Sequence, residues 1–250
     1  MRWSRFGTLS TALVCVLSAS TAFGGFTTIR PPHPGEDSHA QIFSEIYGGT
    51  FVPVGSVDFS NGLLFAKRID DFFVGEAGDP LDMGGPTGGE DDTDQTWRAQ
   101  FTNAIAEARF AAFEQSFGYY LGATGGSFQE LFDVEGEGYD VTGQAPLPLI
   151  ANQLLRWGRN GDNGLFSSRI ADNTDNEDHM VTYQIIPSVP STGEDPRVRW
   201  VVFWEDIRRG EPFEDFDFND LVVEITAIPE PASLASLGLV ALLGMRRRRA

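Results

Sequence analysis

Clusters of acidic side chains are the residues of this sequence best suited to chemistry. The densest lies near the C-terminus and reads FEDFDFNDLVVEI over residues 213–225. In an extended chain, Asp215, Asp217 and Asn219 lie on one side and Phe216 and Phe218 on the other, because successive side chains point to opposite faces. Crowded carboxylate and amide oxygens are ligands that calcium prefers, and close carboxylates repel one another without a cation.

A second acidic pair, Glu205 and Asp206, follows the apolar run 198–204. We expect this pair on a neighbouring strand, beside the first cluster. The alternative interpretation is a capped, hydrogen-bonded turn that holds no metal. The sequence therefore predicts a candidate calcium site, whose ligands are Glu205, Asp206, Asp215, Asp217, Asn219 and Asp220.

The third cluster, over residues 171–180, has Asp172, Asp175 and Asp178 at a spacing of three. On so acidic a chain, a solvated loop explains this cluster as well as a metal site does. His179 is expected to be structural, and the three histidines of the chain form no zinc set.

Signatures of common enzymes are absent from the sequence: it has no Gly-x-Ser-x-Gly, no His-Glu-x-x-His and no phosphate-binding glycine loop. We therefore expect a non-enzymatic protein. One alternative is a carbohydrate-binding module that holds exopolysaccharide, favoured if aromatic rings lie coplanar on one sheet face. A second is a secreted glycoside hydrolase, because paired carboxylates have no short signature.

Both ends of the chain carry export features. Arg2 and Arg5 precede an apolar stretch and small residues over 18–22, which predicts a signal peptide over residues 1–22 that signal peptidase removes together with Cys15. The other end has an apolar stretch, 232–245, that is shorter than the ~20 residues of a stable span and is followed by an arginine block that favours the cytoplasmic side. This tail, residues 228–250, has as its distinctive residues Pro229, Glu230, Pro231, Arg246, Arg247, Arg248 and Arg249.

Composition limits the partners of the body between these signals. Six of the 18 basic residues but only one of the 36 acidic residues lie in the two signals, so the body has a formal charge near −23. Nucleic acid is excluded as a partner, because phosphate binding needs a basic surface. Calcium binding or solubility in a crowded matrix fits such a charge.

The sequence between the two signals predicts a mainly β fold. We expect a two-sheet, jelly-roll-like β-sandwich over 40–227 with one packed helix, after a flexible leader over 23–39. Apolar, β-branched runs at 52–59, 63–71, 180–186, 198–204 and 221–227 predict strands, and Asn61-Gly62 predicts a hairpin turn. Trp97, Phe101 and Ile105 recur at helical spacing, which predicts the clearest helix, starting at Thr93 or Asp94. Residues 40–48 predict a short helix or turn.

The tail resembles the PEP-CTERM sorting signal of Gram-negative bacteria, in which Pro-Glu-Pro, an apolar stretch and an arginine block follow in that order. The resemblance implies recognition by an exosortase, an inner-membrane cysteine protease that cuts near Pro229-Glu230-Pro231. The precursor is then expected in the inner membrane, and the mature protein at the cell surface or in an extracellular polysaccharide matrix.

The segment VVFWEDIRRGEPFEDFDFNDLVVEI, residues 201–225, resembles the C-terminal part of the DUF4114 domain, whose match here extends over about 178–226. The spacer 211–214 is bulkier than the usual Gly-Gly-Asp turn. The resemblance implies an extracellular β domain that is compatible with calcium binding. The residues that carry the pattern are Trp204, Glu205, Asp206, Gly210, Asp215, Asp217, Phe218, Asn219 and Asp220.

Overall fold

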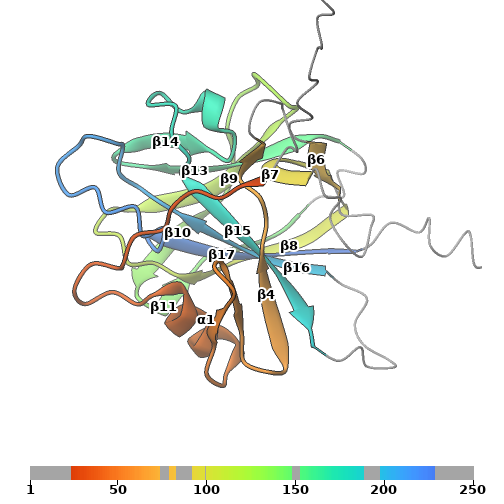
Figure 1. Cartoon of the computed structure of the whole chain (residues 1–250). Helices are drawn as coiled ribbons and strands as arrows, with labels where there is room; N and C mark the ends of the chain where they lie inside the picture. The colour runs from red at the N-terminus through yellow and green to blue at the C-terminus, as the bar shows by residue number, and fades with distance from the viewer. Residues whose placement is uncertain are drawn as a thin grey trace, which may run out of the picture.

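The computed structural model describes residues 24–73, 79–82, 92–98, 100–147, 153–188 and 198–228. Within these ranges the chain forms two large facing β-sheets and one α-helix, α1 (His39–Tyr47), as Figure 1 shows. The predicted mainly β sandwich with a packed helix is therefore confirmed. The predicted signal peptide and sorting tail lie outside the described residues. Among the described helices, none is long and apolar enough to span a membrane.

The larger sheet carries the predicted site at one end of its central strands. Its eight strands follow the order β12–β8–β17–β16–β15–β4–β3–β2. Their bounds are β2 (Val52–Val54), β3 (Asp58–Ser60), β4 (Leu64–Arg68), β8 (Gln100–Ala108), β12 (Gln144–Pro146), β15 (Met180–Pro187), β16 (Val198–Trp204) and β17 (Leu221–Ile228).

The smaller sheet has seven strands, in the order β11–β10–β9–β13–β7–β6 with β14 paired to β13. Its members are β6 (Asp79–Asp82), β7 (Asp92–Arg98), β9 (Gln115–Leu121), β10 (Gln129–Glu137), β11 (Asp140–Thr142), β13 (Leu155–Gly161) and β14 (Gly164–Ser167). A further pair joins β1 (Gly24–Gly25) to β5 (Phe72–Phe73), and a single 3-10 turn, η1, covers Ile170–Asp172.

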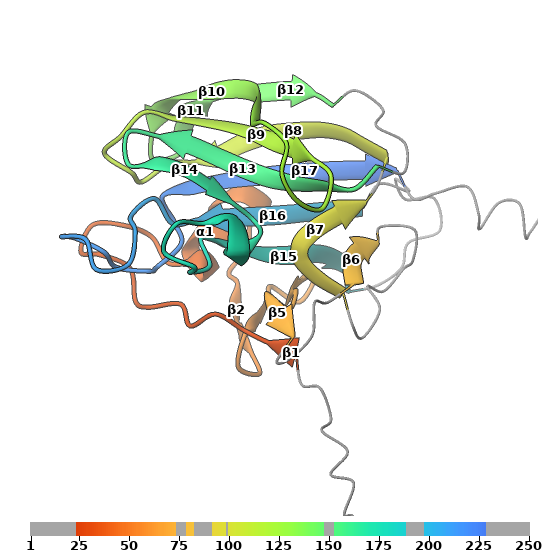
Figure 2. The ribbon, with the colours of Figure 1, turned by 90° about the horizontal axis from the view of Figure 1, so that it is seen from above.

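The central strands of the larger sheet are buried on both faces. Figure 2 shows β9, β10 and β13 in one layer and β15, β16 and β17 in the layer below it. Trp204 of β16 meets Phe117 of the smaller sheet with ring centroids 6.4 Å apart, whereas the adjacent Phe203 packs against Phe43 of α1 at 5.3 Å. This alternation explains the continuous apolar run of β16, because each face of the strand has a core to fill.

The helix predicted from Trp97 onward is wrong: these residues form strands β7 and β8. Burial follows the period of a strand, since Ala104, Ala106 and Ala108 are buried and Ile105 between them is only half-buried. Pairing of β8 with β12 and β17 overrides the helix propensity of this alanine-rich segment.

The helix of the fold is α1, within the segment expected to be a short helix or turn. Its start carries half of a capping box, in which the backbone N–H of Ser38 donates to Gln41 Oε1 at 3.0 Å. Ile42 and Phe43 face the larger sheet and are fully buried. The expected hairpin turn is also confirmed, because Asn61-Gly62 connects β3 to β4 and Gly62 has a φ of 85°.

The leader, predicted to be flexible, is attached to the body at several points from residue 24 onward. Strand β1 pairs with β5, and the hydroxyl of Thr27 donates to Asp178 Oδ2 at 2.6 Å. Further along, the backbone N–H of Arg30 donates to the carbonyl of Phe216 at 2.9 Å. The leader therefore runs beside the loop that joins β16 to β17, residues 205–220.

Candidate metal centre

The pairing of β16 with β17 brings the first three acidic side chains together. Trp204 is opposite Leu221 in the antiparallel ladder, so Glu205 and Asp206, just after β16, meet Asp220, just before β17. Carboxylate oxygens of these three residues all lie within 4.8 Å of one another. We call Glu205, Asp206 and Asp220 the inner triad.

Hydrogen bonds and an ion pair within the protein satisfy only some of the carboxylate oxygens of the inner triad. Glu205 Oε1 accepts a hydrogen bond from the N–H of Ile207 at 3.0 Å, and Asp220 Oδ2 accepts one from the N–H of Asp206 at 2.7 Å. Arg159 lies 3.4 Å from Asp206 Oδ2. Glu205 is 0% exposed, yet its Oε2 accepts no hydrogen bond from the described residues. Because an unpaired buried carboxylate oxygen is costly, this atom indicates a missing cation or proton.

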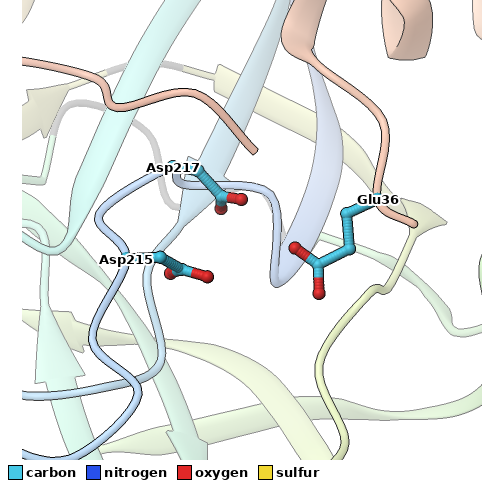
Figure 3. Close-up of side chains that lie close together, drawn as sticks. All are labelled: Glu36, Asp215 and Asp217. Atoms are coloured by element: carbon cyan, nitrogen blue, oxygen red, sulfur yellow. The ribbon is translucent and has the colours of Figure 1, made fainter. Parts of the chain in front are cut away.

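A second triad joins the leader to the loop. Carboxylate oxygens of Glu36, Asp215 and Asp217 also lie within 4.8 Å of one another, and Figure 3 shows the three carboxylates pointing toward a common space. We call these residues the outer triad. Glu36 was missed by the sequence reasoning, because it lies in the leader and no short spacing relates it to the loop. The backbone of His33 strengthens the connection by donating to Asp217 Oδ2 at 3.2 Å.

The loop 205–220, which brings Asp215 and Asp217 together, has no strand over residues 213–220. Phe216 and Phe218 have positive φ angles of 53° and 59°, a left-handed conformation that is rare for such residues, and both rings are buried. The predicted extended segment is therefore wrong: left-handed residues interrupt it, and Asp217 and Asn219 are buried as the two phenylalanines are. Buried rings hold this strained conformation in place.

Asn219, the amide among the predicted ligands, lies beside the outer triad. Its Nδ2 donates to Asp217 Oδ2 at 3.0 Å and to the carbonyl of Asp37 at 3.2 Å. The side chain is buried, and its Oδ1 accepts no hydrogen bond from the described part of the chain. Asn219 Oδ1 is therefore a second buried oxygen in the cluster, after Glu205 Oε2, that has no hydrogen-bond donor among the described residues.

Burial and mutual repulsion disfavour ionisation throughout the cluster. Burial, followed by the charges of Asp215, Asp206 and Asp217, raises the pKa of Glu205 from 4.5 to about 8. Burial and then the charge of Asp215 raise the pKa of Asp217 from 3.8 to about 7. The pKa of Asp220 lies well above its ordinary value for the same reasons, burial and the charges of Asp206 and Glu205. The two triads therefore interact electrostatically.

The cluster forms one wall of a cavity of about 480 Å³, which the loop and the segment 110–113 enclose. Glu36, Asp206, Asp215 and Asp220 all line it, so ions and water can reach both triads. Phe213 lies at its rim and is 90% exposed.

The third acidic cluster, residues 171–180, does not converge on one point. Each of its carboxylates has a partner of its own, and His179 stacks on Phe166 with ring centroids 3.9 Å apart, as a structural residue does. The partners are Arg169 for Asp172 at 2.8 Å, His179 for Asp175 at 2.9 Å, Arg209 for Glu177 and Thr27 for Asp178 at 2.6 Å.

Comparisons with known proteins match two parts of the chain to family models. Residues 148–227 match the family model for a domain of unknown function, DUF4114, and residues 227–249 match that for the PEP-CTERM protein-sorting motif. No curated protein matches the sequence. The DUF4114 match contains all six predicted ligands and leaves out Glu36. The chain thus carries a DUF4114 domain and a PEP-CTERM sorting motif, which marks it as an exported protein addressed to an exosortase.

Proposed function

We propose that this protein is a non-enzymatic component of the cell surface or its polysaccharide matrix, with a β domain that calcium stabilises. One observation carries the calcium part of the proposal. The buried Oε2 of Glu205 has no hydrogen-bond donor among the described residues, although it lies where oxygen ligands of the inner triad converge. The sorting motif supports the export part.

Calcium fits the donor set better than other common metals do. The candidate ligands are carboxylates and one amide, and calcium takes six to eight such oxygens in flexible geometry. Magnesium requires near-ideal octahedral geometry and retains waters, which suits a crowded carboxylate cluster poorly. Zinc prefers nitrogen and sulfur ligands, and none of the clustered side chains supplies them.

The arrangement supports a structural role over the two alternatives. The ligands come from the leader, the end of β16 and the start of β17, so a bound ion cross-links three segments. Among the described phenylalanines, tyrosines and tryptophans, only Phe26 and Phe213 are exposed, and they lie on the leader and the loop rather than in a row on a sheet face. The candidate acids also form two groups of three, whereas glycosidases use a facing pair of carboxyls that flanks the scissile bond.

Calcium binding is expected to strengthen as pH rises from 6 to 8. Folding raises the pKa of Glu205 from 4.5 to about 8, so the metal-free folded state binds this proton more tightly than the unfolded chain does. The stabilisation from that proton is complete below pH 4.5 and is lost as pH rises toward 8. Because calcium replaces the proton, its affinity should increase about tenfold or more over this interval, with proton release.

Calorimetric titration of chelator-stripped protein with calcium, at pH 6 and pH 8 and in two buffers of different ionisation enthalpy, measures the calcium affinity and the number of protons released. Asp217→Asn should weaken binding, because it removes a charged ligand of the outer triad, whereas Asp133→Asn, at an exposed acid on β10, should leave it unchanged. Absence of any calcium heat at pH 8 would refute the calcium part of the proposal.

A further inference from the structure

We propose that the acidic cluster is a two-cation centre, with one calcium ion in the inner triad and a second in the outer triad. This inference rests on the calcium site proposed above and adds the number of ions and a separate task for each.

The two triads are neighbouring groups of carboxylates within one cluster, in which Glu205 of the inner triad contacts Asp215 of the outer triad. Each has three carboxylates whose oxygens lie within 4.8 Å of one another, and they share no residue. Glu205, which is fully buried and has an unpaired Oε2, points to an ion in the inner triad independently of the acidic clustering. Near the outer triad, Asn219 offers a second unpaired oxygen on a side chain that is 1% exposed.

Charge balance favours more than one divalent ion when all six carboxyls are ionised. The triads contain six carboxylates, and Arg159, 3.4 Å from Asp206, is the cationic side chain paired with them in the described residues. One calcium ion and Arg159 offset three of the six negative charges, whereas two calcium ions and Arg159 offset five. Buried charges are tolerated only when they are paired, so two ions fit the burial of the inner triad and of Asp217.

The surroundings of the triads assign the two ions different tasks. In the inner triad, Glu205 and Asp206 are 0% and 1% exposed and Asp220 is half-buried, so an ion there would be the more deeply buried of the two and would hold the ends of β16 and β17 together. In the outer triad, Glu36 and Asp215 are half-buried and line the cavity. An ion there would bind less tightly and would fasten the leader to the loop, next to the hydrogen bond from His33 to Asp217.

Metal analysis of the exported protein, equilibrated with calcium and freed of excess ion, tests the number directly. We expect two calcium ions per chain, one in Glu36→Gln, one in Glu205→Gln and two in Glu45→Gln, a matched change at an exposed acid of α1. One ion in the wild-type protein would overturn the two-cation inference and leave the proposed function standing. No bound ion would overturn both.

Hydrogen exchange separates the two tasks. Glu36→Gln should speed exchange in residues 30–37 severalfold and leave the β16–β17 ladder unchanged, because the inner ion remains. Equal loosening of both regions would contradict separate ions. If Glu205→Gln fails to fold, the wild-type count and the Glu36→Gln exchange pattern still decide the question.

Discussion

Removal of calcium is expected to lower the melting temperature of the exported protein by about 5 to 10 °C. A metal bound only by the folded state stabilises it by about 2.7 kcal/mol at a hundredfold excess over Kd. A domain of roughly 200 residues changes its melting temperature by about 2–4 °C for each kcal/mol. The effect should be visible by calorimetry at neutral pH, with the same protein measured in calcium and in chelator.

The expected drop in melting temperature follows from the crowded carboxyl groups that the calcium-free fold must hold together. Asp217 and Asp220 are held close to other carboxylates, and burial raises the pKa of both. Without a cation, the fold must either take up protons or hold repelling charges. Magnesium should restore less stability, because it accepts crowded carboxylates poorly.

Asp217→Ala should reduce the calcium-dependent rise, since it removes a ligand of the outer triad and a contact of the leader. Asp133→Ala is the matched control, because Asp133 is an exposed acid outside the cluster. An unchanged melting temperature in millimolar calcium, for protein first stripped by chelator, would leave the acidic loop as a hydrogen-bonded cap with no metal.

The central strands could be predicted from the sequence because burial dictates their composition. Every residue of 198–204 except Arg199 is apolar, and the predicted strand coincides with β16. Residues 93–112 misled the prediction because alanine and well-spaced aromatic residues satisfy a helical period. Their state is decided by pairing of β7 with β6 and β13 and of β8 with β12 and β17, which local sequence does not encode.

Only part of the candidate site could be predicted from the sequence, namely the ligands that lie close together along the chain. Its five acids and one amide from residues 205–220 are close in sequence, so the pairing of β16 with β17 brings them near one another. Glu36 reaches the outer triad through the path of the leader, which depends on hydrogen bonds such as that from Arg30 to Phe216. The division into two triads depends on the left-handed residues Phe216 and Phe218, whose conformation their residue type does not predict.

The largest cellular effect is expected from the tail. If Pro229-Glu230-Pro231 directs processing, replacing all three residues with alanine should leave the precursor in the inner membrane and deplete the protein from the surface. The reason is that the apolar stretch and the arginine block after it would stay attached to the body. Cell fractionation with an antibody to the β domain measures the distribution.

Mass spectrometry of the surface protein locates the processing itself. Wild-type protein from its native host should end near residue 229 and lack the arginine block, whereas an intact Ala250 on surface protein would contradict exosortase processing. Asp217→Ala is the informative control, because it alters the metal centre and leaves the sorting motif complete. We expect this variant to be sorted and cut like the wild type, since the motif at 227–249 lies outside the residues that hold the metal. Retention of Asp217→Ala in the membrane would instead mean that processing requires the calcium-bound fold.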